Sequence, residues 1–150
     1  ITIRKVDTKD EPLAGATFLL EGSEDGSLWY PVIPGSNGVC TLGEPSEENL
    51  AAASKTSGED GLLTWENLPI TLQYRITETK APEGYTLLKD YAFVGTLPAD
   101  NTKMELRVVN GEAFALPKTG STDLTVLPFA VISCFSFCAG AILYLRKREI

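Results

Sequence analysis

The sequence LQYRITETKAPEGY, residues 72–85, has the alternation of a β-strand that runs into a turn. Successive side chains of a strand point to opposite faces, so Leu72, Tyr74 and Ile76 share one face. The next position on that apolar face is Glu78. An ionised carboxylate is very costly to bury unless it is paired or protonated. The stretch therefore predicts a half-buried strand, and the inward position of Glu78 needs a physical reason.

Six further segments have the alternation or the β-branched and aromatic content of short strands, with Gly, Pro and Asp between them. They are residues 1–7, 15–22, 27–33, 61–68, 89–97 and 103–110. Pro31 favours an edge position for its strand, and Asp60-Gly61 is a strong hairpin signal. About seven short strands over roughly 110 residues predict an antiparallel β-sandwich.

A longer polar insertion, residues 36–58, interrupts this series of strands. Within it, the sequence SEENLAAAS, residues 46–54, predicts one short surface helix capped by Ser46. We interpret the insertion as decoration of the fold. The alternative is that it forms an exposed binding surface together with Trp29 and Tyr30.

Composition excludes several classes of function. The chain has 150 residues, of which 43% are hydrophobic, and a formal net charge of −7. In residues 1–112, nine Lys and Arg stand against eighteen Asp and Glu, a balance of −9 that argues against a nucleic-acid partner. The chain has no His and no Cys or carboxylate cluster with metal-ligand spacing, so we expect neither metal nor cofactor. Its three Cys residues, Cys40, Cys134 and Cys138, do not form a disulfide framework.

Near the C-terminus, residues 124–145 (LTVLPFAVISCFSFCAGAILYL) contain no charged residue over twenty-two positions. A helix needs about 20 apolar residues to cross the hydrocarbon core of a bilayer, so this segment predicts a transmembrane helix. The tail, residues 146–150, begins with basic residues, which places it in the cytoplasm and the rest of the chain outside. The membrane-retaining residues are Arg146, Lys147 and Arg148.

The alternation test places two more polar residues on apolar faces. The face of the two isoleucines in the first strand continues to Lys5, and the apolar face of residues 103–110 continues to Asn110. One interpretation is that each polar residue lies at a sheet end and reaches water, or that Lys5 and Glu78 form a salt bridge. Alternation alone does not exclude it.

The other interpretation is that Lys5, Glu78 and Asn110 react together. Burial lowers the pKa of a Lys, and a Lys amine is a nucleophile only when neutral. A buried Glu that is protonated donates a hydrogen bond to a carboxamide oxygen and polarises its carbon. Lys5 then attacks the side-chain carbonyl of Asn110, Glu78 relays the protons and ammonia leaves. The product is an amide cross-link between the two side chains.

Three stretches closely resemble the Cna B-type (SpaA-like) domains of Gram-positive surface proteins and pili. They are IRKVDTKDEPLAGATFLL (residues 3–20), GLLTWENLP (61–69) and YRITETKAPEGY (74–85). The resemblance covers residues 1–112 and implies a transthyretin-like (Ig-like) β-sandwich. One departure is LPITLQY (residues 68–74), where the family often has a Gly-containing turn before the Tyr.

Many domains of this family form an intramolecular isopeptide bond. The reactive Lys of the family precedes the Asp of the first-strand motif, a position that Lys5 occupies here. The catalytic Glu opens the ET.AP.GY motif, which is Glu78 here, and the Asn at the end of the last strand is Asn110. The resemblance thus implies the same three residues that the alternation test selects.

A linker, residues 113–123, lies between the domain and the apolar segment and contains the sequence LPKTG. It resembles an LPxTG sorting signal, and its residues are Leu116, Pro117, Lys118, Thr119 and Gly120. The resemblance implies that a membrane sortase cleaves between Thr119 and Gly120 and that a peptidoglycan amine resolves the thioester. Pro117 has a fixed φ and no N–H, which favours an extended, accessible backbone.

These motifs predict the C-terminal part of a longer secreted protein, attached covalently to the cell wall of a Gram-positive bacterium after transient membrane anchoring. Its predicted role is structural, as a stalk module stiffened by the isopeptide bond. It is not an enzyme beyond that single intramolecular turnover. Two alternatives stay open. The chain is the end of a pilus subunit that joins other pilins, or its domain binds host matrix.

Overall fold

The computed structural model describes residues 1–99 and 103–113. Within these ranges it contains nine β-strands and one helix. In chain order they are β1 (Thr2–Val6), β2 (Thr17–Ser23), β3 (Tyr30–Pro34), β4 (Cys40–Leu42), α1 (Glu47–Ala53), β5 (Ser54–Thr56), β6 (Leu62–Thr64), β7 (Gln73–Lys80), β8 (Phe93–Thr96) and β9 (Glu105–Val109).

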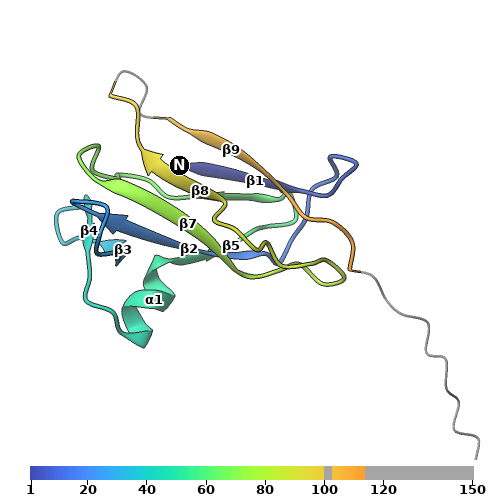
Figure 1. The fold of residues 1–150 in the computed structure, drawn as a ribbon, viewed down its shortest axis with the longest axis horizontal. Coiled ribbons are helices and arrows are strands. Elements are labelled where there is room, and N and C mark those ends of the chain that lie inside the picture. The colour runs from blue at the N-terminus through green and yellow to red at the C-terminus, as the bar shows by residue number, and fades with distance from the viewer. Residues whose placement is uncertain (100–102, 114–150) are drawn as a thin grey trace, which may run out of the picture. The chain divides into compact units, whose positions relative to one another are not determined.

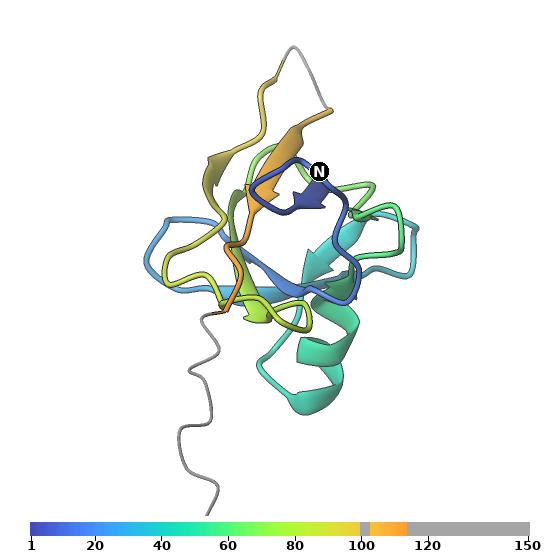
Figure 2. The ribbon, with the colours of Figure 1, turned by 90° about the vertical axis from the view of Figure 1, so that its right-hand side faces the viewer.

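The strands form two sheets that face each other (Figures 1 and 2). The smaller sheet has the order β6-β1-β9, and the larger has the order β4-β3-β2-β7-β8, with β5 also paired to β2. Their inner faces bury one apolar core, to which β1 contributes Ile3, β2 contributes Phe18 and Leu20, and β7 contributes Tyr74 and Ile76. The predicted all-β sandwich is confirmed.

One strand pair differs from the antiparallel arrangement that the sequence predicts. β1 and β9 are parallel, whereas the other strand pairs of the described residues are antiparallel. Parallel neighbours cannot be joined by a hairpin, and here most of the domain lies between them. The register pairs Lys5 with Val108 and Val6 with Val109. Asn110, the residue after β9, therefore lies beside the end of β1.

The predicted edge position of Pro31 is wrong, because β3 lies between β2 and β4. Pro31 is nevertheless compatible with this inner strand. Its carbonyl oxygen accepts a hydrogen bond from the N–H of Gly43, which lies just beyond the end of β4. A residue's N–H and C=O point to the same side of a strand, so the missing N–H falls where the β4 ladder has already ended.

The insertion accounts for the strands that exceed the predicted seven. β4 and β5 both lie within it, and α1 between them confirms the predicted helix. Ser46 is the N-cap, since its Oγ accepts the N–H of Asn49 at 3.1 Å. Glu47 and Glu48 lie in the first turn, where negative charge stabilises a helix.

Candidate functional site

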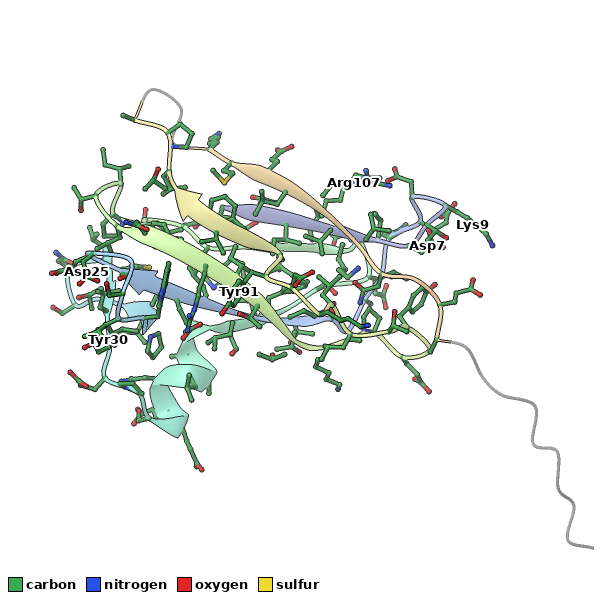
Figure 3. The ribbon with its side chains drawn as sticks, viewed as in Figure 1. Asp7, Lys9, Asp25, Tyr30, Tyr91 and Arg107 are labelled. Atoms are coloured by element: carbon green, nitrogen blue, oxygen red, sulfur yellow. The ribbon has the colours of Figure 1, made fainter. Side chains whose placement is uncertain are left out.

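The three polar residues on apolar faces are brought to one end of the sandwich. β1, β7 and β9 all run toward this end in Figure 1, and Figure 3 labels Asp7 and Arg107 there. Lys5 is 0% exposed, Glu78 2% and Asn110 1%. None of the three side chains reaches water, so a position at a solvated sheet end does not account for them.

Glu78 and Asn110 are in direct contact. Asn110 Nδ2 donates to both carboxylate oxygens of Glu78, to Oε1 at 2.9 Å and to Oε2 at 3.0 Å. The backbone N–H of Leu88 donates to Oε2 at 2.9 Å. Asn110 Oδ1 is the only buried side-chain oxygen or nitrogen of the described residues that has no hydrogen-bond partner. A buried acceptor without a hydrogen bond costs free energy of folding, so the Asn110 carboxamide is the group of this site whose present contacts are incomplete.

Lys5 lies beside Asn110 on the neighbouring strand. Its Nζ donates to the carbonyl oxygens of Val108, at 3.1 Å, and Val6, at 3.2 Å. The backbone N–H of Asn110 donates to the same Val6 oxygen at 3.1 Å. The ion pairs of the described residues do not include one between Lys5 and Glu78. The buried amine is therefore held by two backbone carbonyls, one of which also accepts the backbone N–H of Asn110.

Burial lowers the pKa of Lys5, while the charges of Glu78 and Asp7 oppose this shift. Removal from water disfavours the ammonium form, and this effect is the largest of the three. The neutral amine is the nucleophilic form. Burial thus shifts Lys5 toward the neutral state, in which it can attack a carbonyl carbon.

Gly61 supports the backbone of Lys5. Its carbonyl oxygen accepts the N–H of Lys5 at 2.8 Å. Gly61 has a φ of +73°, and a Cβ there would collide with the carbonyl oxygen of Lys5. The hairpin that Asp60-Gly61 predicts is wrong, because β5 and β6 on either side of it belong to different sheets. The glycine is needed instead for close approach, since only glycine lets β6 start this close to β1.

An amine, a carboxyl and a carboxamide buried together at the end of a small β-sandwich can be compared with known proteins. The sequence profile described as SpaA, prealbumin-like fold domain, matches residues 1–112. The chain belongs to this family. It is a SpaA-like, Cna B-type domain over the matched residues. A comparison with curated protein sequences finds no match.

Pilin proteins are among the solved structures that are similar to this SpaA-like domain. The backbone protein of pilus 2b from group B streptococcus is 27% identical, with a TM-score of 0.57 over 74% of this chain and 40% of that one. BcpA, the major pilin subunit of Bacillus cereus, is 24% identical, with a TM-score of 0.51 over 75% and 29%. The shaft pilin SpaA from Lactobacillus rhamnosus GG is 22% identical, with a TM-score of 0.50 over 77% and 48%. This chain spans less than half the length of each.

Residues 68–74, where the sequence departs from the family pattern, are held together by a hydrogen bond within the segment. The hydroxyl of Tyr74 donates to the carbonyl oxygen of Pro69 at 2.6 Å, and the Tyr74 side chain is fully buried. Burial raises the pKa of this phenol. The segment reaches the start of β7 without the Gly-containing turn, and the strand that carries Glu78 keeps its inward alternation.

Several predicted features lie outside the described residues. They are the LPKTG motif of residues 116–120, the apolar segment 124–145 and the basic tail 146–150. Residues 1–99 and 103–113 contain no helix that is long and apolar enough to cross a membrane. The same ranges contain no group of His, Cys, Asp and Glu residues that is suited to a metal ion.

The sequence did not indicate that backbone groups would form much of the site. The N–H of Leu88 and the carbonyl of Val108 bind Glu78 and Lys5, and neither depends on the identity of its side chain. The aromatic residues singled out as a binding surface lie elsewhere. Trp29 stacks over the Arg75 guanidinium at 4.8 Å, and Figure 3 shows Tyr30 at the end of the domain opposite Asp7.

Proposed function

We propose that this chain is a stiff stalk or shaft module of a Gram-positive surface protein, held by a covalent bond between Lys5 and Asn110. The observation that carries the proposal is the joint burial of an amine, a carboxyl and a carboxamide where β1 and β9 end. Its function is mechanical, and its chemistry is limited to one intramolecular turnover.

The bond forms by transfer of an acyl group from one nitrogen to another. Lys5 Nζ attacks Cγ of Asn110, a C–N bond forms to Nζ, and the bond from Cγ to Nδ2 breaks. Glu78 takes a proton from the amine and passes one to Nδ2, which leaves as ammonia. A half-turn of the carboxamide brings its unsatisfied Oδ1 to face Glu78, and the carboxyl, once it holds the proton taken from the amine, donates to Oδ1 and polarises Cγ.

The salt-bridge interpretation accounts for fewer of the contacts. A buried ion pair persists only where good geometry and further hydrogen bonds compensate for the loss of hydration. Here the Lys5 amine contacts two carbonyl oxygens, and the Glu78 carboxylate contacts an amide and a backbone N–H. The contacts of the Asn110 carboxamide with Glu78, and of Lys5 with the strand end that leads to Asn110, support a reaction among the three groups more than an ion pair between two of them.

A pilus shaft is the second candidate setting for the same domain. It is favoured by the 27% identity to a pilus backbone protein, a structure of which this chain matches 40%. In either setting the domain transmits tension along a surface structure. Denaturing gels of wall extracts distinguish the two, because a pilus subunit runs as a ladder of covalent polymers and a separately anchored protein as one species.

Anchoring to the wall is proposed to use LPKTG, with the apolar segment holding the chain at the membrane until a sortase cleaves between Thr119 and Gly120. A segment of twenty-two uncharged residues is long enough to span a bilayer. The basic residues that follow it favour retention on the cytoplasmic side. The order of motif, span and basic tail supports this proposal more than the pentapeptide alone does.

The Thr119→Ala variant is expected to lose wall attachment, with most of the protein shifting to the membrane fraction. The measurement is cell fractionation, in which detergent extracts the variant and a muralytic enzyme is required to release the wild type. Thr122→Ala is the matched control, because it makes the same change outside the pentapeptide and leaves release unchanged. Wall-bound Thr119→Ala protein would contradict the proposed anchoring.

A further inference from the structure

The segment of residues 84–88 contacts both sides of the candidate site. The N–H of Leu88 donates to Glu78 Oε2 at 2.9 Å. Two residues earlier, Thr86 donates to the carbonyl oxygen of Gly111 through its N–H, at 3.0 Å, and its hydroxyl, at 3.1 Å. One short stretch of backbone therefore fixes the position of the carboxyl and of the residue next to Asn110.

A further backbone pairing fixes the chain just beyond Asn110. Ala113 donates its N–H to the carbonyl oxygen of Gly84 at 2.8 Å, and Tyr85 forms an antiparallel bridge with Glu112. Gly84 has a φ of +82°, a conformation that L-residues with a side chain rarely adopt. The turn before Tyr85 thus directs residues 84–88 along the chain that leaves β9.

The two oxygens of Glu78 have different surroundings. Oε2 accepts from both Leu88 and Asn110, whereas Oε1 accepts from Asn110 alone. An oxygen that already accepts a backbone N–H has less capacity to carry a proton than its partner. The contact with Leu88 therefore leaves Oε1 as the oxygen that exchanges protons with the reacting groups.

We propose that the backbone N–H of Leu88 is a positioning group for the Lys5–Asn110 reaction, because it holds the Glu78 carboxyl by Oε2 against the carboxamide and leaves Oε1 without a backbone donor. This inference rests on the proposed function. It assigns a role to a backbone N–H, a group that does not depend on the identity of the side chain. The side chain of Leu88 is not required for it, so a change of side chain and a loss of N–H have different effects.

The test removes the N–H of Leu88 in two ways. An amide-to-ester replacement between residues 87 and 88 substitutes oxygen for that N–H, and Leu88→Pro removes the same donor by mutation. Leu87→Ala is the matched control, because it shortens the exposed neighbouring leucine and keeps the Leu88 donor. Each variant of the 150-residue chain is made by cell-free translation with detergent present, and the Lys5–Asn110 cross-linked peptide is followed over time by mass spectrometry.

We expect the ester and Leu88→Pro to form the bond roughly tenfold or more slowly, a part of the about 10²–10⁴-fold that a positioned acid–base group contributes. Leu87→Ala is expected to react at nearly the wild-type rate. Because Leu88→Pro also fixes φ, the ester decides the result if the proline variant does not fold. An ester chain that reacts as fast as the wild type overturns the proposal.

To distinguish a positioning role of the Leu88 N–H from a purely structural one, the substitutions are repeated in a Lys5→Met background, where no bond forms. There the ester is expected to change thermal stability little, while the reaction rate in the wild-type background falls. A rate that falls only in step with stability overturns the positioning role. A wild-type chain that never forms the bond overturns the proposed function itself, which is a different result from an unchanged ester rate.

Discussion

Pulled from its two ends, the wild-type domain is expected to show no unfolding extension, whereas Lys5→Met is expected to unfold and lengthen. Tension that enters at Ile1 runs along β1 to Lys5, crosses the bond to Asn110 and leaves through the residues that follow β9. The roughly 100 residues between the bonded positions are bypassed, and at about 3.3–3.6 Å each they account for an extension on the order of 300 Å in the variant.

Because β1 and β9 are parallel, the domain resists force even without the covalent bond. Without the bond, force along both strands shears their shared hydrogen bonds, so Lys5→Met still resists before it yields. Methionine fills the space of the lysine stem without placing an unreacted amine in the core. Single-molecule force spectroscopy gives the extension directly. Equal extension in the two proteins would show that the site is not a mechanical clamp.

Glu78→Gln is expected to lower the melting temperature by roughly 20–40 °C, since a domain of this size loses about 4–8 °C for each kcal/mol. The expected loss of free energy of unfolding is about 4.7 kcal/mol, the chain-entropy value for a cross-link that closes a loop of about 100 residues. Glutamine keeps the size of the side chain, and its oxygen can still accept the N–H of Leu88. It cannot relay protons, so the bond does not form.

The control for this prediction is that the losses of melting temperature in Glu78→Gln and Lys5→Met do not add up in the double variant. If Glu78→Gln acts through the missing bond, then adding Lys5→Met to it lowers the melting temperature little further, because the bond is already absent. Calorimetry of the two single variants and the double variant gives the comparison. Losses that add in full would assign both residues to independent packing contributions and would argue against a shared covalent bond.

The sequence predicted the inward residues well because alternation is a local property. Tyr74 and Ile76 are fully buried, Glu78 continues their face, and the two other selected residues, Lys5 and Asn110, are equally buried. The helix capped by Ser46 was predicted for the same reason, since capping depends on residues within one turn. Patterns that are completed within a few residues were the reliable ones.

The features that the sequence did not predict depend on pairing between distant segments. The short strands β4 and β5 have little pattern of their own, and they exist because β3 and β2 offer them ladders. The parallel arrangement of β1 and β9 is a property of the whole chain path. The inner position of Pro31 depends on where a neighbouring strand ends. The donor at Leu88 is invisible in sequence, because every residue except proline has that N–H.

The total mass of the protein does not test the bond sufficiently. Asn110 is followed by Gly111, and an Asn-Gly pair can lose ammonia by closing on its own backbone to a cyclic imide. That loss has the same mass as the proposed cross-link. The location of the new bond, and not only the missing ammonia, is therefore the quantity to measure.

Tryptic peptide mapping of the folded wild-type protein tests the central claim most directly. The bond blocks cleavage after Lys5, so the account predicts residues 5–9 joined to residues 108–118, at the sum of their masses less one ammonia. Fragmentation places the link between Lys5 and Asn110, and the joined peptide is absent from Glu78→Gln. Separate peptides from the folded wild type, with cleavage after Lys5 and an intact Asn110, would contradict the account.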